Sequence, residues 1–172
     1  MSLKVIQPGI LSLLQDAGRR GHHRIGLTNG GPLDREAFDY CNRLLGNAPG
    51  SMDFAEQGCR AYLGVAQGFE IPHSFGSAAT VMRENIGGLS GDKLHAGDVL
   101  PCPAIRGRRR LYLPEAHRPH YSSEITVRVI PGYQQHNFDR MQQRRFFSHT
   151  YVVSDRCDRM GYRLEGPAIG CD

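Results

Sequence analysis

The chain has 172 residues, a formal net charge of +4 and a modest apolar share of 40%. This length is enough for one domain, or two small lobes, with a real core. No apolar run approaches the roughly 20 residues that cross a bilayer, and the start has neither the apolar stretch nor the cleavage site of a signal peptide. We therefore expect a cytoplasmic protein with no membrane partner.

The chain predicts a mainly β protein. The 21 glycines and 10 prolines indicate many turns, and short strands at regular turn spacing are typical of a β-barrel or sandwich. The β-branched and alternating segments that we predict as strands are Leu3–Ile6, Arg60–Val65, Leu111–Leu113, Ile125–Ile130 and Thr150–Val153.

A glycine-rich polar loop follows the first strand, from Asp16 to Asp34. Glycines such as Gly30 and Gly31 allow positive φ and close approach of the backbone, so the loop could wrap a small polar or anionic ligand. The loop also leads into a helix, whose free N–H groups attract anions. A tight strand–loop–helix connection without a ligand explains the same residues equally well.

One clear helix is predicted over Pro32 to Leu45. Pro32 and Asp34 are start signals, an apolar stripe runs along one face, and Gly46 or Asn47 ends the helix. A second, weaker helical pattern covers Asn137 to Phe147.

No complete nucleotide or metal motif accompanies these elements. Gly87–Lys93 lacks the register of a phosphate-binding loop. His117 and His120 have metal-like spacing, but Pro119 between them prevents a shared helix face. The five cysteines are odd in number and contain no Cys-x-x-Cys, so we expect reduced thiols and no metal site.

Basic residues stand beside aromatic ones at Arg106–Tyr112 and at Arg144–Phe147. Such neighbours can bind nucleic acid, but acidic residues are spread throughout the chain and no nucleic-acid-binding signature is present. A solvated face or a contact with another protein chain is the better explanation, so we expect no nucleic-acid partner.

Alternating charges fill the block from Ser154 to Leu164. Asp155–Arg156 and Asp158–Arg159 could stabilise a turn through local ion pairs. Alternatively, Arg159 or Arg163 could hold a carboxylate or phosphate through its planar guanidinium group, with Asp158 orienting the arginine.

Several blocks together resemble a known family, the bacterial allophanate hydrolase subunit 2 or C-type 5-oxoprolinase subunit, which is similar to the carboxyltransferase domain of urea carboxylase. Some members are described as antagonists of a kinase inhibitor. The blocks carrying the resemblance are the Asp16–Asn47 segment, Arg60–Gly68 with Gly76–Thr80, Gly87–Leu100, and Ser154–Leu164.

The chain also departs from that family's pattern. It looks shortened, since a β-stretch is missing between Gly58 and Arg60 and a second half rich in glycine and glutamine is missing after Pro167. Gln67 stands where the family usually has a glycine.

The resemblance implies a fold and a domain organisation. It implies a cyclophilin-like β-barrel with the helix from Pro32 to Leu45 and an incomplete second lobe. Residues 1–172 would form a single carboxyltransferase-like domain, or two lobes with a boundary near 57–60 or 114–124.

The resemblance implies an ATP-dependent 5-oxoprolinase that opens 5-oxoproline, a small lactam, to glutamate. Partners would be a subunit 1-like protein (the B-type 5-oxoprolinase subunit) and a lactam-utilisation protein (the A-type subunit), and the cofactors ATP and magnesium could be bound by those partners. One alternative is a carboxyltransferase of the urea carboxylase or allophanate type, with biotin carried on another chain. A second is a non-enzymatic regulatory binding protein.

For the expected chemistry we predict one concave site, formed where the Asp16–Asp34 loop meets the Asp158–Arg163 block. Cationic and backbone N–H groups would stabilise developing phosphate charge, and a carboxylate would orient water or magnesium. The predicted catalytic residues are Asp16, Arg19, Asp34, Asp158 and Arg159, and the predicted cofactor-binding residues are Gly30, Gly31 and Arg163.

Overall fold

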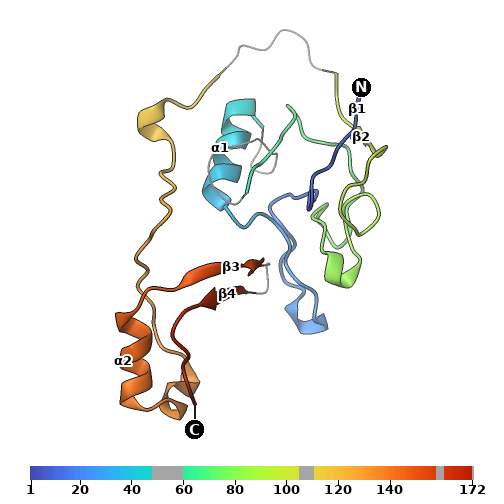
Figure 1. Cartoon of the computed structure of the whole chain (residues 1–172). Helices are drawn as coiled ribbons and strands as arrows, with labels where there is room; N and C mark the ends of the chain where they lie inside the picture. Colours follow the sequence, from blue (N-terminus) through green and yellow to red (C-terminus); the bar gives the residue numbers. More distant parts are fainter. Residues whose placement is uncertain (48–59, 105–110, 158–160, 172) are drawn as a thin grey trace. The chain divides into compact units, whose positions relative to one another are not determined.

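The structure is a computed structural model that describes residues 1–47, 60–104, 111–157 and 161–171. Figure 1 shows few regular elements joined by long irregular stretches. The described residues divide into two compact units, Met1–Tyr121 and Ser122–Asp172. Within these residues no helix has the length and apolar character needed to cross a membrane.

The first unit contains one helix and one small sheet. Strand β1 (Ser2–Lys4) pairs antiparallel with β2 (Val99–Pro101), and Leu3 lies opposite Leu100. Leu100 is buried with Leu14 and Ile71, and Leu3, Val5, Phe69, Ala78 and Leu94 pack against them. The core of this unit therefore joins residues that lie as far apart in the chain as Leu3 and Leu100.

Helix α1 (Arg35–Leu45) confirms the clear helix, with a later start than predicted. The Asp34 carboxylate accepts a hydrogen bond from the Ala37 N–H, and Gly46 ends the helix in the left-handed conformation. The buried face carries Phe38 and Cys41, and the ring of Phe38 meets Tyr62 edge-on at 5.7 Å between centroids. The N-cap and the glycine were both readable from sequence because they act locally.

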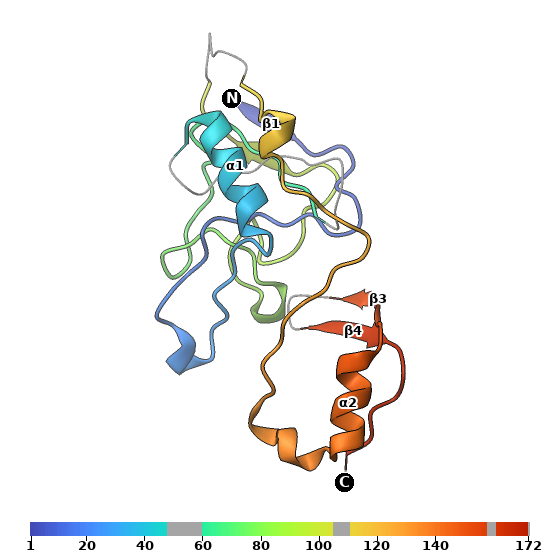
Figure 2. The same cartoon turned by 90° about the vertical axis from the view of Figure 1, so that its left-hand side faces the viewer.

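The second unit holds helix α2 (Arg140–Ser148) and the antiparallel hairpin of β3 (Val152–Cys157) and β4 (Tyr162–Glu165). The C-terminal segment runs back beside α2 (Figures 1 and 2), because the Arg145 guanidinium donates to the Ala168 carbonyl and the Gly170 N–H to the Gln142 side chain. Four short 3-10 helices complete the described elements: His23–Ile25, Met82–Glu84, Glu115–His117 and Tyr133–Asn137.

Three of the five predicted strands are wrong as strands. Segments 60–65, 111–113 and 125–130 pair with no other strand in the described parts of the chain. Their composition favours extended backbone, but a ladder also needs a neighbouring strand, which local sequence cannot supply. The described residues form two two-stranded sheets, so the mainly β character has support while the closed barrel stays a prediction.

Candidate functional site

The Asp16 carboxylate anchors the glycine-rich loop. One oxygen accepts hydrogen bonds from the Gly18 N–H at 2.8 Å and the Ser77 hydroxyl at 2.6 Å. The other accepts from the Ala78 N–H at 2.6 Å. Two of these three donors belong to the 74–80 segment, so the charged acceptor fixes the loop against that segment.

Arg19 belongs to the same loop and is only 1% exposed. Its Nη2 donates to the Ala79 carbonyl at 2.6 Å and its Nε to the Ser74 carbonyl at 3.4 Å. Nη1 is buried without a hydrogen-bond partner, and none of the described carboxylates lies within ion-pair distance. A buried guanidinium that donates to backbone carbonyls stabilises the packing of the two segments, because water and ligands have little access to it.

Two glycines enclose this guanidinium. A Cβ added at Gly30 would lie 3.2 Å from Arg19 Nη1 and 2.9 Å from the Ala79 Cβ, and one at Gly87 would lie 3.0 Å from Arg19 Nη2. Both glycines have positive φ, +66° and +77°. The glycine pattern of this loop thus has a packing explanation, whether or not a ligand binds there.

Asp34 and two tyrosines form a second polar group at the start of α1. The Tyr121 hydroxyl donates to the carboxylate oxygen of Asp34 that does not cap the helix. The Asp34 N–H donates to the Tyr62 hydroxyl oxygen at 2.9 Å. Both oxygens of this carboxylate are therefore engaged by protein donors.

These surroundings raise the pKa of both tyrosines. Burial, then the hydrogen bond to Asp34 and its negative charge, raise the pKa of Tyr121 to about 12. Burial also raises the pKa of Tyr62, with the Asp34 N–H acting in the opposite direction. Both hydroxyls stay protonated at neutral pH, so Tyr121 is a hydrogen-bond donor and not a base.

The predicted site residues fall into three places. Asp16, Arg19 and Gly30 contact the 74–80 segment, and Gly31 packs on Ala17 within the loop. Asp34 lies at the start of α1. Arg163 is exposed on β4 in the second unit, while Asp158 and Arg159 lie outside the described residues. A shared cleft between the loop and the Asp158–Arg163 block stays a prediction.

These contacts also decide whether the described residues could bind a nucleotide or a metal ion. Asp16 and Asp34 use both carboxylate oxygens inside the protein, and Arg19 is enclosed by glycines. Within the described ranges no three His, Cys, Asp or Glu side chains gather as metal ligands do. The described residues therefore do not fit a magnesium–ATP site, and we derive no step through one.

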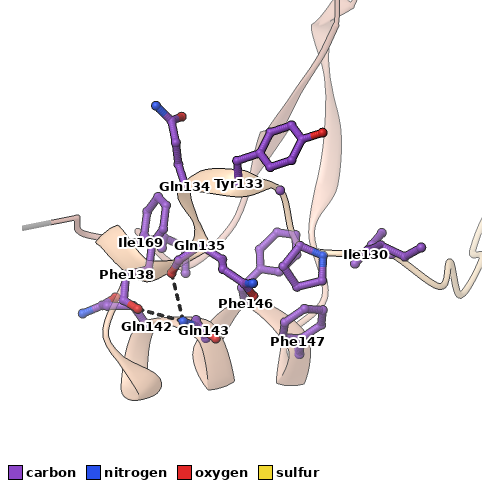
Figure 3. Close-up of a pocket in the computed structure, with 13 residues that line it drawn as sticks. Ile130, Tyr133, Gln134, Gln135, Phe138, Gln142, Gln143, Phe146, Phe147 and Ile169 are labelled. Atoms are coloured by element: carbon purple, nitrogen blue, oxygen red, sulfur yellow. Dashed lines mark hydrogen bonds between the residues drawn. The ribbon is translucent and has the colours of Figure 1, made fainter.

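Sequence reasoning missed a cavity of about 630 Å³ in the second unit (Figure 3). Its walls come from residues 129–135 and Phe138, from α2 and from Ile169, and its aromatic members are Tyr133, Phe138, Phe146 and Phe147. The Gln143 amide reaches back to the carbonyls of Gln135 and Phe138 at 3.0 and 2.8 Å. The available signal was the apolar pair Phe146–Phe147 at the end of a polar helix.

The model of the carboxyltransferase domain, subdomain A and B, matches residues 51–171. The chain belongs to this carboxyltransferase-domain family. The C-type 5-oxoprolinase subunit of Escherichia coli (strain K12) is 28% identical over 218 residues, which cover 97% of this chain and 69% of that protein. The corresponding protein of Haemophilus influenzae is 25% identical over 91% of this chain and 66% of its own length.

Other members of the carboxyltransferase-domain family are larger proteins. Urea amidolyase of Saccharomyces cerevisiae is 26% identical over 96% of this chain but only 12% of its own length. Among solved structures, TTHA0988 in space group P212121 superposes with a TM-score of 0.78 at 27% identity, over 98% of this chain and 43% of that one. The Kluyveromyces lactis urea carboxylase, at 23% identity and a TM-score of 0.71, supports the fold alone.

Proposed function

We propose that this chain is the C-type component of an ATP-dependent 5-oxoprolinase, which opens 5-oxoproline to glutamate together with A-type and B-type subunits in the cytoplasm. The observation that carries the proposal is the match to the C-type 5-oxoprolinase relative along 97% of this chain and 69% of that protein. The urea amidolyase match covers as much of this chain but only 12% of that protein.

The described geometry supports a positioning role for this chain in the reaction. Asp16 and Arg19 have their charged groups occupied by the 74–80 segment, so we assign them the role of holding the loop beside the reacting groups. ATP and magnesium would then be bound by the partner subunits. Phosphorylation of the lactam oxygen would let water attack the amide carbon and expel the ring nitrogen as the amine, and a second water would hydrolyse the resulting acyl phosphate to glutamate and inorganic phosphate. Negative charge at the phosphate in these steps would be stabilised by cationic groups.

Arg159 and Arg163 are the cations we propose for that contact, with Asp158 orienting Arg159. The planar guanidinium of an arginine can donate two parallel hydrogen bonds to two oxygens of a phosphate or carboxylate. Gly30 and Gly31 would allow the backbone of the loop to approach the same phosphate closely. This assignment requires that the 158–163 block reach the loop in the assembled complex.

Reconstitution tests the proposed function. The purified chain alone should release no glutamate from 5-oxoproline and ATP. Addition of the A-type and B-type subunits should give glutamate with one ADP per turnover, and omission of this chain should abolish it. If the complex instead transfers a carboxyl group from carboxybiotin to urea, the chain is a carboxyltransferase, and if it binds a partner without turnover, it is a regulatory protein.

A further inference from the structure

A strained phenylalanine stands in the tight turn between Ser74 and Ser77. These two serines pair across the turn, and the Ser74 N–H donates to the Ser77 carbonyl at 2.8 Å. The two central residues, Phe75 and Gly76, both have positive φ, +54° and +77°. Such a turn favours asparagine followed by glycine, because a bulky side chain is strained at positive φ. Phenylalanine therefore makes this turn less stable than asparagine would.

Burial of the Phe75 ring does not offset this strain. The ring is 53% exposed and meets the ring of His22 edge-on, at 5.4 Å between centroids. The Ile25 N–H donates to the His22 carbonyl at 3.1 Å, which closes the loop beside this ring pair. These residues all belong to the first unit. A strained residue that the core does not require is typical of a binding site.

Cationic residues flank His22 in the chain. Arg20, His23 and Arg24 lie within two positions of it, and residues 17–33 include no acidic residue. None of these three side chains makes an ion pair or a hydrogen bond within the parts of the chain that the structure describes. Uncompensated arginines attract carboxylate groups and pair with them through the planar guanidinium. The ring pair is therefore bordered by charges that suit an acidic ligand.

We propose that Phe75, His22, Arg20 and Arg24 form a docking surface for an acidic segment of a partner subunit, with an apolar side chain of that segment against the Phe75 ring. The partner is a subunit of the proposed 5-oxoprolinase, so this inference rests on the proposed function. Aromatic residues and arginines are enriched in protein interfaces. The strain at Phe75 is then offset by contacts that form only in the complex.

Phe75→Asn tests the ring, by binding of the full chain to a mixture of the A-type and B-type subunits. The variant should raise the melting temperature of this chain, because asparagine tolerates positive φ, and should weaken binding about tenfold or more. Gln67→Asn is the matched control. Gln67 is exposed at a φ of +69°, and its N–H donates to Asn47, away from the docking surface. This control should also raise the melting temperature but leave binding unchanged.

Arg24→Glu tests the acidic chemistry of the partner. This variant should slow association about threefold or more at low ionic strength, and the difference from wild type should shrink at high salt. Lys4→Glu is the control, because it changes the charge by the same amount on β1, outside the docking surface.

Four results would overturn the proposal. Binding by Phe75→Asn and Arg24→Glu that equals wild-type binding would remove this surface and leave the proposed function intact. A lower melting temperature of Phe75→Asn would show that the ring serves folding. Equal slowing by Lys4→Glu and Arg24→Glu would show attraction by net charge alone. Absence of any complex with the wild-type chain would contradict the docking surface and the proposed function together.

Discussion

The Ser77 hydroxyl donates a 2.6 Å hydrogen bond to the carboxylate of Asp16, 61 residues earlier in the chain. The Ala78 N–H donates to the second oxygen of the same carboxylate. This pair of contacts joins the glycine-rich loop to the 74–80 segment, and the buried Arg19 joins the same two segments through hydrogen bonds to the Ser74 and Ala79 carbonyls. The loop is therefore a fixed part of the first unit.

Asp16→Asn should lower the free energy of unfolding by about 1.5–3 kcal/mol, the cost of weakening hydrogen bonds to a charged group. The amide nitrogen of the asparagine would face N–H or O–H donors whose hydrogen bonds the carboxylate now accepts. Urea denaturation measures the change. Asp92→Asn is the control, because that carboxylate is 45% exposed and, among the described residues, its partners are the nearby Lys93 N–H and His95. Equal effects of the two substitutions would contradict the anchoring role.

Arg19→Lys should destabilise the first unit by about 2–3 kcal/mol, since a lysine cannot reproduce two directed bonds to the Ser74 and Ala79 carbonyls. Arg20→Lys, next to it and exposed, should change the free energy of unfolding by less than about 0.5 kcal/mol. A ligand-binding role for Arg19 predicts the reverse pattern, with stability unchanged and ligand affinity lost. Thermal melting in parallel with binding separates the two.

Gly30→Ala should cost about 1–3 kcal/mol more than Gly21→Ala, by overpacking against Arg19 and Ala79. Both glycines have positive φ, +66° and +85°, so both substitutions carry backbone strain. Only the Gly30 site has neighbours within 4 Å of the added methyl group. Chemical denaturation of the two variants measures the difference, and equal losses would show that conformation alone explains the loop glycines.

Tyr121→Phe should remove a contribution to stability that itself disappears at high pH. The pKa of Tyr121 is raised from 10.0 to about 12 in the folded chain, so the folded state favours the protonated hydroxyl. Its contribution is fully present below a pH of about 10 and is lost as pH rises through about 12. Unfolding free energies of wild type and variant should differ near neutral pH and converge at strongly alkaline pH. Tyr133→Phe, a fully exposed tyrosine, should show no such convergence.

The sequence was sufficient for features that depend on near neighbours. Asp34 and Gly46 define both ends of α1 through contacts within four residues, and the family motifs predicted the membership that the comparisons confirm. The predicted residues Asp16, Arg19 and the loop glycines do gather in one place.

Features that depend on distant segments could not be predicted. The burial of Arg19 depends on carbonyls that lie 55 and 60 residues away, and no local pattern distinguishes such an arginine from an exposed one. The 125–130 segment has strand composition without a strand partner in the described chain. The cavity of the second unit depends on how α2, the 129–135 segment and Ile169 pack together.

The most direct test of the proposed function is glutamate release by the reconstituted three-component complex, measured with wild-type chain and with Arg159→Ala. We expect ATP-dependent conversion of 5-oxoproline that requires this chain. The variant should lower kcat/KM by about 10- to 150-fold, the equivalent of the roughly 1.5–3 kcal/mol of a charged hydrogen bond. Full activity of the A-type and B-type subunits without this chain would contradict the account.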